Sequence, residues 1–117
     1  MSLTSVTGSA TSSKITPHTL LERKQAARPI TALTAYDYAT ARLADEAGID
    51  FLLVGDSLAM VVMGLESTLP VTVDEMLHHT RAVRRAVRRA MLVVDMPYGS
   101  YHVSLDEGIA NAARFVK

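Results

Sequence analysis

Three short apolar runs alternate with longer amphipathic segments along this chain. The runs occupy residues 31–34, 51–54 and 91–94, and the last two read Phe-Leu-Leu-Val and Met-Leu-Val-Val. Continuous apolar runs of this length are typical of strands buried on both faces. Strands that alternate with helices predict an α/β fold with a parallel sheet and right-handed crossovers. The pattern therefore predicts three βα units. A complete (β/α)₈ barrel takes about 250 residues, so three units would be only its first part.

Capping residues mark where the intervening helices begin. Asp37 is placed to cap a helix over residues 38–47, and Gly48 suits the position after its end. Thr72-Val73-Asp74-Glu75 and Ser104-Leu105-Asp106-Glu107 have the capping-box pattern. Helical spacing after these boxes predicts two buried stripes. They consist of Val73, Met76, Leu77, Thr80, Val83 and Val87 in the first helix, and of Leu105, Ile109, Ala112, Ala113 and Val116 in the second.

The start of the chain differs in composition from the rest. Residues 1–13 are rich in Ser and Thr and carry no charge, which predicts a disordered arm rather than a signal peptide. Residues 14–117 are then expected to belong to one domain, in which residues 19–27 are expected to form a short helix packed by Leu20 and Leu21. The sequence leaves open whether Lys117 is a natural end.

Composition excludes several classes of function. Acidic and basic residues balance at 12 each among 117 residues, so no overall charge attracts nucleic acid or an anionic membrane. The absence of cysteine excludes disulfides and thiolate sites, and no apolar run approaches the roughly 20 residues of a membrane span. A cytoplasmic setting is expected.

Two aspartates follow the second and third apolar runs directly. Asp56 comes after Gly55, where the second run stops, and Asp95 comes immediately before Met96-Pro97. Ligands of parallel α/β folds bind at the carboxyl edge of the sheet, so Asp56 and Asp95 are expected to converge there. Two neighbouring carboxylates repel each other, and a hard divalent cation such as Mg²⁺ relieves the repulsion. The alternative is that each aspartate caps the helix or turn that follows its strand.

Three further features, an apolar segment, a pair of histidines and a run of arginines, are expected to have structural rather than functional roles. The segment 58–70 is apolar and is expected to fold over the top of the sheet near Asp56, with an ordinary packed loop as the alternative. His78 and His79 are adjacent on a helix and lack the i, i+4 spacing of a zinc pair, which favours a structural role. The arginine run could bind phosphate or RNA, but a solvated helix face is the expectation. Its members are Arg81, Arg84, Arg85, Arg88 and Arg89.

Five segments, in order and with natural spacing, together resemble the ketopantoate hydroxymethyltransferase family, which is also called 3-methyl-2-oxobutanoate hydroxymethyltransferase. The resemblance covers residues 14–117, rather less than half of a family member. The segments are Thr34-Ala35-Tyr36-Asp37, Leu53-Val54-Gly55-Asp56-Ser57, Ser67-Thr68-Leu69-Pro70-Val71-Thr72, His79-Thr80 with Ala82-Val83-Arg84-Arg85, and Asp95-Met96-Pro97-Tyr98-Gly99-Ser100-Tyr101.

This resemblance implies a TIM barrel, of which the chain holds the first three βα units, and a homo-oligomer that is a decamer in the family. It implies hydroxymethyl transfer from 5,10-methylenetetrahydrofolate to 3-methyl-2-oxobutanoate with Mg²⁺, giving 2-dehydropantoate in pantothenate biosynthesis. Asp56 and Asp95 would be the metal ligands, and Asp56, Ser57 and Asp95 would contact the keto acid. The metal would polarise the keto group and acidify the neighbouring C–H, so that a base can form the enolate.

The resemblance also implies what this chain lacks. A substrate-binding Lys and a metal-associated Glu on the family's next strand, and a later Glu proposed as the base, all fall beyond Lys117. The isolated chain is therefore expected to be inactive, with no catalytic base of its own. Ala86 stands where the family usually has Gly, which affects the end of a helix and not the site.

Two other functions compete with this interpretation. A different Mg²⁺-dependent enzyme of the phosphoenolpyruvate mutase and isocitrate lyase group would share the barrel and the strand-end carboxylates, but a Cys-bearing lyase loop would favour it, and this chain has no Cys. A receiver-like signalling module is suggested by Asp95-Met96-Pro97, although the spacing is one residue short and no paired acids follow the first strand.

Overall fold

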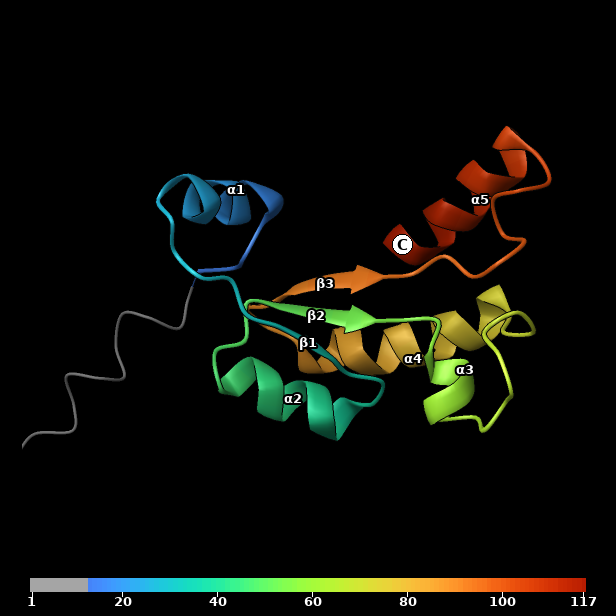
Figure 1. Cartoon of the computed structure of the whole chain (residues 1–117), viewed down its shortest axis with the longest axis horizontal. Coiled ribbons are helices and arrows are strands. Elements are labelled where there is room, and N and C mark those ends of the chain that lie inside the picture. The colour runs from blue at the N-terminus through green and yellow to red at the C-terminus, as the bar shows by residue number, and fades with distance from the viewer. Residues whose placement is uncertain (1–12) are drawn as a thin grey trace, which may run out of the picture.

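The computed structural model describes residues 13–117 and places a three-stranded parallel sheet at their centre (Figure 1). Its strands are β1 (Ala32–Thr34), β2 (Phe51–Val54) and β3 (Met91–Val94). In the register, Leu52 of β2 lies between Leu33 and Leu92. The expected parallel βα order is confirmed, with the first strand beginning one residue later than predicted. The predicted arm over residues 1–13 lies outside the described residues, except for Ser13.

The order of the strands decides between two of the competing folds. The order is β1-β2-β3, so each strand pairs with its neighbour in sequence. A receiver-like or flavodoxin-like sheet would instead place the first strand between the second and the third. The sequential order therefore contradicts the receiver-like alternative.

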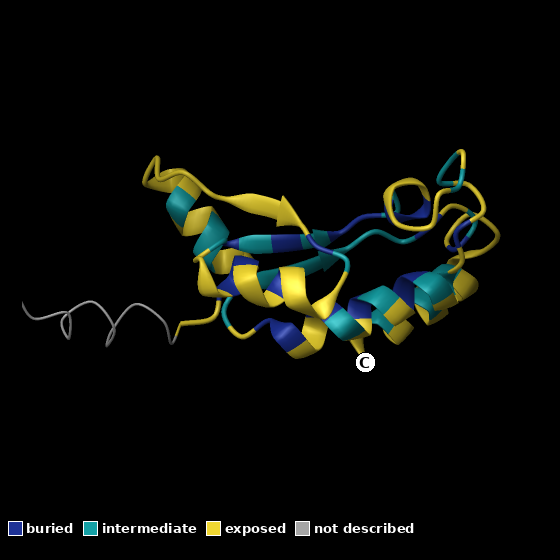
Figure 2. Cartoon of the chain, turned by 90° about the horizontal axis from the view of Figure 1, so that it is seen from below, coloured by how far each residue is buried: buried dark blue, intermediate teal, exposed yellow. Residues whose placement is uncertain are grey.

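Residues 13–117 form five helices, and two of them, over residues 38–46 and 73–86, cover one face of the sheet. Leu52 and Val54 of β2 are fully buried, and Ala41 and Met76 belong to the same core cluster. Phe51 and Leu53 point to the opposite face by strand alternation and are only partly buried. Figure 2 shows β1 as an exposed outer strand beside the more buried β2. The helices are α1 (Pro17–Gln25), α2 (Tyr38–Glu46), α3 (Leu58–Val61), α4 (Val73–Ala86) and α5 (Leu105–Val116).

Local capping explains where α2, α4 and α5 begin. Asp37 accepts a hydrogen bond from the Thr40 N–H, as predicted, and Gly48 has the positive φ of +90° that suits the end of α2. Thr72 and Ser104 each accept the N–H of the residue three positions later. The predicted stripe of α4 is largely correct. Met76, Leu77, Thr80 and Val83 are buried.

Three predictions about packing failed wholly or in part. The segment 58–70 begins with α3, and within it Leu58 and Ala59 are buried and Leu65 is partly buried against the core, while most of the other residues are exposed. The α5 stripe fails too: Ile109 is 59% and Val116 is 89% exposed. Of the predicted stripe only Ala112 is half-buried, together with Gly108, Asn111 and Phe115 outside it, and α5 packs chiefly against α4. In α1, which starts at Pro17, no residue is buried, and Leu21 is 51% exposed.

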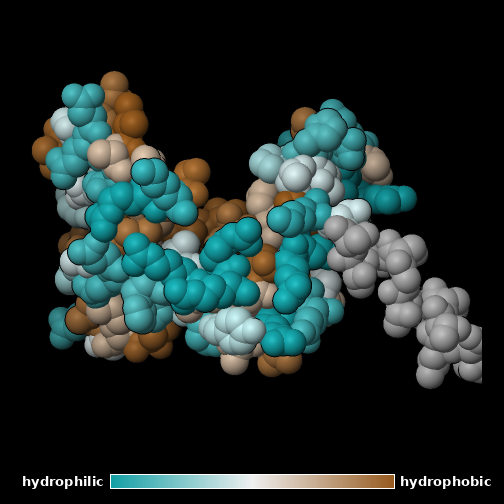
Figure 3. All heavy atoms as spheres, turned by 180° about the vertical axis from the view of Figure 1, so that it is seen from behind, coloured by the Kyte–Doolittle hydropathy of each residue, from teal (hydrophilic) through white to brown (hydrophobic). Residues whose placement is uncertain are grey.

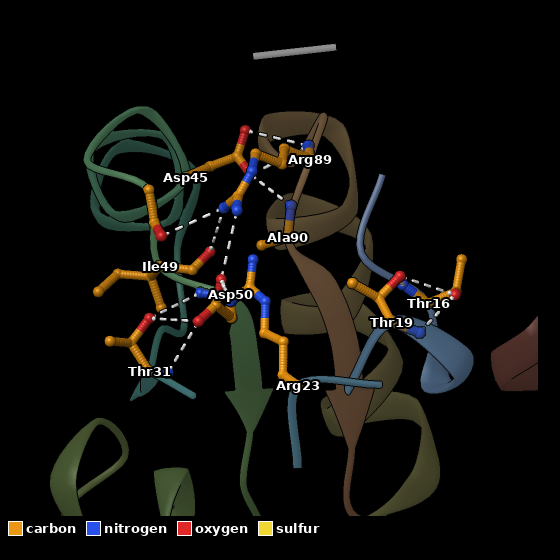
Figure 4. A network of polar contacts seen from close by, with 10 residues as sticks. Thr16, Thr19, Arg23, Thr31, Asp45, Ile49, Asp50, Arg89 and Ala90 are labelled. Atoms are coloured by element: carbon orange, nitrogen blue, oxygen red, sulfur yellow. Dashed lines mark hydrogen bonds and ion pairs between the residues drawn. The ribbon is translucent and has the colours of Figure 1, made fainter. Parts of the chain in front are cut away.

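A network of carboxylates ties the amino-terminal edge of the sheet together (Figure 4). Asp45, at the end of α2, accepts the backbone N–H groups of Arg88, Arg89 and Ala90, which precede β3. Its side chain therefore fixes the path from α4 into β3, because these N–H groups have left the helix and must find acceptors elsewhere.

Asp50 completes the same network immediately before β2. Its Oδ2 accepts from the N–H and hydroxyl of Thr31 at 2.9 and 3.1 Å, and its Oδ1 pairs with Arg23 and Arg89. Burial acts to raise the pKa of Asp50, but the hydrogen bonds from Thr31 and Arg23 outweigh it and lower the pKa from its ordinary value. Arg89 also donates to the carbonyls of Gly48 and Ile49. The predicted solvated arginine face therefore fails at Arg89, because this side chain pairs with a buried acid.

Candidate functional site

Asp56 and Asp95 lie together at the carboxyl ends of β2 and β3. The Asp95 N–H donates to the Val54 carbonyl at 3.0 Å, which extends the pairing of the two strands by one residue. The Asp56 N–H in turn donates to Asp95 Oδ2, also at 3.0 Å. Within the described residues, neither the Asp56 carboxylate nor Asp95 Oδ1 has a hydrogen-bond or ion-pair partner. The Asp95 carboxylate is thus held against the backbone of Asp56 beside a pocket that both residues line, and most of the acceptor capacity of the two carboxylates is free.

Gly55 makes this convergence possible. A Cβ placed on Gly55 would lie 3.3 Å from Asp95 Oδ2 and 3.4 Å from Ser57 Oγ. The first distance is tighter than an ordinary van der Waals contact, so a side chain here would push the Asp95 carboxylate away. The glycine therefore leaves room for a carboxylate and a hydroxyl close to the backbone between β2 and α3, where a side chain would otherwise lie.

The Ser57 hydroxyl belongs to a chain of contacts that reaches back to the first strand. Ser57 Oγ lies 3.0 Å from the Tyr36 hydroxyl, and the Tyr36 backbone carbonyl lies 2.8 Å from His79 Nδ1. A carbonyl can only accept, so Nδ1 of His79 carries the proton in this contact. His79 therefore has the structural role that was expected. The expectations had given Tyr36 no role, although its place just beyond β1, at the same edge of the sheet, was a usable signal.

An open pocket of about 510 Å³ lies beside the two aspartates. It is lined by Asp56, Val94, Asp95, Met96 and Tyr101. Tyr101 comes from the loop after β3, and its ring stacks on His102 with the ring centroids 4.3 Å apart. Buried Ser100 holds this loop, since its hydroxyl donates to the Pro97 carbonyl and its own carbonyl accepts from Asn111 of α5. The pocket thus combines two carboxylates, apolar walls and a half-exposed aromatic ring.

The donor set of this pocket suits a hard cation in part. Carboxylate oxygens are the ligands that Mg²⁺ prefers, and Mg²⁺ usually keeps several waters and takes only one or two protein carboxylates. The described residues contain no cluster of three or more His, Cys, Asp or Glu side chains arranged for a metal. Asp56 and Asp95 alone therefore fit a water-rich Mg²⁺ site and do not fit a closed site made only of protein ligands.

A second, larger groove lies between α4, β3 and α5, at about 800 Å³. Its floor includes Leu77, Met91 and Leu92, and no carboxylate lines it. Seen from behind, hydrophobic atoms fill the notch between the lobe that carries α5 and the lobe that carries α1, with hydrophilic side chains around them (Figure 3). The cations on its wall are Lys14, Arg81, Arg84, Arg85, Arg88, Arg114 and Lys117. The arginine run and the two aspartates are thus in different places, and the groove does not belong to the carboxylate pocket.

Comparison with known proteins agrees with this geometry. The family model described as ketopantoate hydroxymethyltransferase matches residues 14–117. A 3-methyl-2-oxobutanoate hydroxymethyltransferase of Koribacter versatilis is 69% identical over 105 residues, which are 90% of this chain and 36% of that protein. The enzymes of the same name from Thermoanaerobacter sp. and Gloeobacter violaceus are 56% and 60% identical, and each match covers 38% of the relative.

Among solved structures, a phosphonopyruvate hydrolase in complex with oxalate and Mg²⁺ shares the fold with a TM-score of 0.55. The identity is 20%, and the match covers 66% of this chain and 27% of the hydrolase. No helix in the described part of the chain is long and apolar enough to cross a membrane. The chain spans somewhat over a third of the length of the curated relatives named above. With a family model that matches nearly the whole of its sequence, the chain belongs to the ketopantoate hydroxymethyltransferase family.

Proposed function

We propose that this chain is the amino-terminal part of a (β/α)₈-barrel enzyme that transfers a hydroxymethyl group from 5,10-methylenetetrahydrofolate to 3-methyl-2-oxobutanoate. The product is 2-dehydropantoate, on the route to pantothenate, and the setting is the cytoplasm. The observation that carries the proposal is the pair Asp56 and Asp95, held at adjacent strand ends with free acceptor oxygens over Gly55. Identity of 56–69% to enzymes of this name supports it.

The residues of this chain supply binding and orientation. Asp56 and Asp95 would hold the magnesium ion, and Asp56, Ser57 and Asp95 would face the keto acid. When bound, Mg²⁺ supplies Lewis-acid polarisation of the keto oxygen, which lowers the pKa of the adjacent C–H. The Asp56 N–H keeps Asp95 Oδ2 in place at 3.0 Å, so the second carboxylate is oriented before any ligand arrives. The general base is not among these residues and belongs to a later part of a complete barrel.

A hybrid enzyme tests this proposal. Residues 1–117 are joined to the part of the Koribacter versatilis relative that follows the matched segment, which supplies the remaining length. The expected result is Mg²⁺-dependent formation of 2-dehydropantoate, measured with 5,10-methylenetetrahydrofolate as donor, while residues 1–117 alone show none. The relative itself, assayed in parallel, is the positive control.

A folded hybrid that forms no 2-dehydropantoate, beside an active relative, would refute the proposed function. A phosphonopyruvate hydrolase assay on the same hybrid checks the competing keto-acid chemistry, to which this chain has only a fold-level likeness. Size-exclusion chromatography with light scattering checks the proposed homo-oligomer, a decamer by family likeness.

A further inference from the structure

The hydroxyl of Ser57 does not cap α3, although Ser57 occupies the N-cap position of that helix. Ser57 is the residue before α3, where a serine normally accepts a backbone N–H of the first turn. Here its backbone is already helical, with φ −60° and ψ −12°, and its side chain makes no capping hydrogen bond. The hydroxyl lies instead 3.0 Å from the hydroxyl of Tyr36. Its orientation is therefore set by a tyrosine from another strand end.

We propose that Tyr36 is a positioning residue for substrate binding. Its phenol O–H donates to Ser57 Oγ, which leaves the Ser57 O–H to donate to an anionic oxygen of the ligand, the carboxylate of a 2-keto acid. A serine hydroxyl has one proton and can accept and donate at the same time, whereas the phenol is the more acidic of the two donors. Accepting from Tyr36 also polarises the Ser57 O–H and strengthens the bond that it donates. The identity of the acid rests on the proposed function.

Tyr36 itself is held from three sides. Its ring packs against the hydrophobic core, and the preceding Ala35 N–H donates to the Leu53 carbonyl at 3.1 Å. Its backbone carbonyl accepts from His79 Nδ1 at 2.8 Å. A side chain fixed in this way loses little conformational freedom when the ligand binds, which is the condition for effective orientation.

The competing explanation is that the Tyr36–Ser57 hydrogen bond only ties β1 to α3. The two explanations differ in a measurable way. A tie between elements contributes to the free energy of unfolding whether or not a ligand is present. A positioning contact changes ligand affinity, and it does so only while the Ser57 hydroxyl is there to be oriented.

The test uses the hybrid enzyme and the dissociation constant of 3-methyl-2-oxobutanoate, measured by calorimetry with Mg²⁺ present and without the folate. The variants are Tyr36→Phe, Ser57→Ala and the double variant. Tyr36→Phe is expected to raise the dissociation constant about 3–10-fold, in line with one hydrogen bond, and Ser57→Ala at least as much. The double variant should equal Ser57→Ala, because Tyr36 acts through Ser57. In steady-state kinetics the same variants should raise KM for the keto acid with kcat within about two-fold.

Tyr38→Phe is the matched control. It removes another tyrosine hydroxyl, an exposed one that accepts from Arg42, and should leave the dissociation constant unchanged. Equal affinity in Tyr36→Phe and parent would overturn the inference, as would effects of the two single variants that simply add in the double variant. A parent hybrid that binds no keto acid would overturn it as well. A parent that binds the acid but forms no 2-dehydropantoate refutes the proposed function alone, and the comparison of dissociation constants still decides the role of Tyr36.

Discussion

The two edges of the sheet use the same residue type in opposite ways. At the amino-terminal edge, both oxygens of Asp45 and both oxygens of Asp50 accept hydrogen bonds or ion pairs from the chain itself. At the carboxyl-terminal edge, Asp56 and Asp95 share one internal hydrogen bond between them, from the Asp56 N–H to Asp95 Oδ2. The first pair is buried, at 8% and 4% exposure, and the second pair is only partly so and lines a pocket.

Hydrogen-bond satisfaction thus distinguishes carboxylates that stabilise the fold from carboxylates that are free to bind a ligand. A buried carboxylate whose oxygens are all satisfied is occupied by the fold, and its removal leaves donors without acceptors. A carboxylate that is held by its backbone while its oxygens stay free is available to a ligand. By this criterion Asp45 and Asp50 maintain the fold, whereas Asp56 and Asp95 are available for chemistry. Each of the four predictions below tests one side of the comparison, using the hybrid enzyme.

The largest effect is expected from Asp95→Asn at the carboxyl-terminal edge, called the open edge here because most of its carboxylate oxygens are free. Turnover should fall about 10²–10³-fold, because the proposed metal and substrate ligand loses its charge. The free energy of unfolding should change by less than about 1 kcal/mol, since removing one of two adjacent like charges relieves repulsion. Steady-state kinetics across a magnesium titration and urea unfolding measure the two quantities. Turnover that remains at the parental level at every magnesium concentration would contradict the assigned role.

At the amino-terminal edge, called the closed edge because its carboxylate oxygens are all satisfied, Asp45→Ala should lower stability and leave kcat/KM nearly unchanged. Three backbone N–H groups, those of Arg88, Arg89 and Ala90, lose their acceptor, which is expected to lower the free energy of unfolding by about 3 kcal/mol. The kcat/KM per folded molecule should stay within about two-fold. Asp37→Ala is the control. This exposed carboxylate also accepts a backbone N–H, and its loss should cost only about 1 kcal/mol. Equal losses of stability in the two variants would contradict the role of burial.

The open edge could be predicted from the sequence and the closed edge could not. Asp56 and Asp95 directly follow apolar runs, so strand periodicity and parallel pairing are enough to bring them together. Asp45 lies inside a predicted helix and Asp50 in a two-residue link to β2. The partners of Asp45 are 43–45 residues away in sequence, and those of Asp50 are 19–39 residues away. No local pattern encodes such distances. Arg89 was misassigned for the same reason, because its periodicity with Arg85 indicated a solvated face.

The prediction for α5 failed for a different physical reason. Its apolar spacing at Leu105, Ile109 and Val116 is real, but spacing identifies only which face is apolar and not what covers it. In this chain α5 packs chiefly against α4, and its half-buried residues include Ala112, which the prediction contained, and Phe115, which it did not. The well-predicted α4 lies against β2, which is itself paired on both sides. Apolar spacing therefore predicted the buried face of α4, which contacts both α2 and β2, better than that of α5.

A smaller effect on the open edge is expected from Gly55→Ala. The added methyl group would lie 3.3 Å from Asp95 Oδ2, so the carboxylate must move by a few tenths of an ångström. The expected result is a decrease in kcat/KM of about ten-fold, because misplacement of a catalytic constellation by a fraction of an ångström reduces turnover more than stability. The backbone of Gly55 lies outside the left-handed region, so alanine fits it and the free energy of unfolding should not fall. A large loss of stability with unchanged kcat/KM would contradict this role.

The smallest effect distinguishes the two edges by their response to acid. The pKa of Asp50 is lowered in the folded state, where hydrogen bonds from Thr31 and the charge of Arg23 outweigh burial. Its contribution to stability is therefore fully present above the unfolded-state pKa, near 3.9, and is lost as the pH falls through the lower folded-state value. Asp50→Asn should accordingly be less stable than the parent at pH 7, and the gap should narrow as the pH falls below about 4.

Urea unfolding of the two proteins at a series of pH values between about 6 and 3 measures this gap, with Glu46→Gln as the control because its exposed pair with Arg42 adds little to stability. Asp95→Asn should show no comparable gap at pH 7, since the oxygens of Asp95 are mostly free in the fold. A gap for Asp50→Asn that stays constant down to pH 3 would mean that its stabilisation does not depend on the charge. In that case hydrogen bonds that an amide can also accept, and not the ion pairs with Arg23 and Arg89, would hold the closed edge of the sheet together.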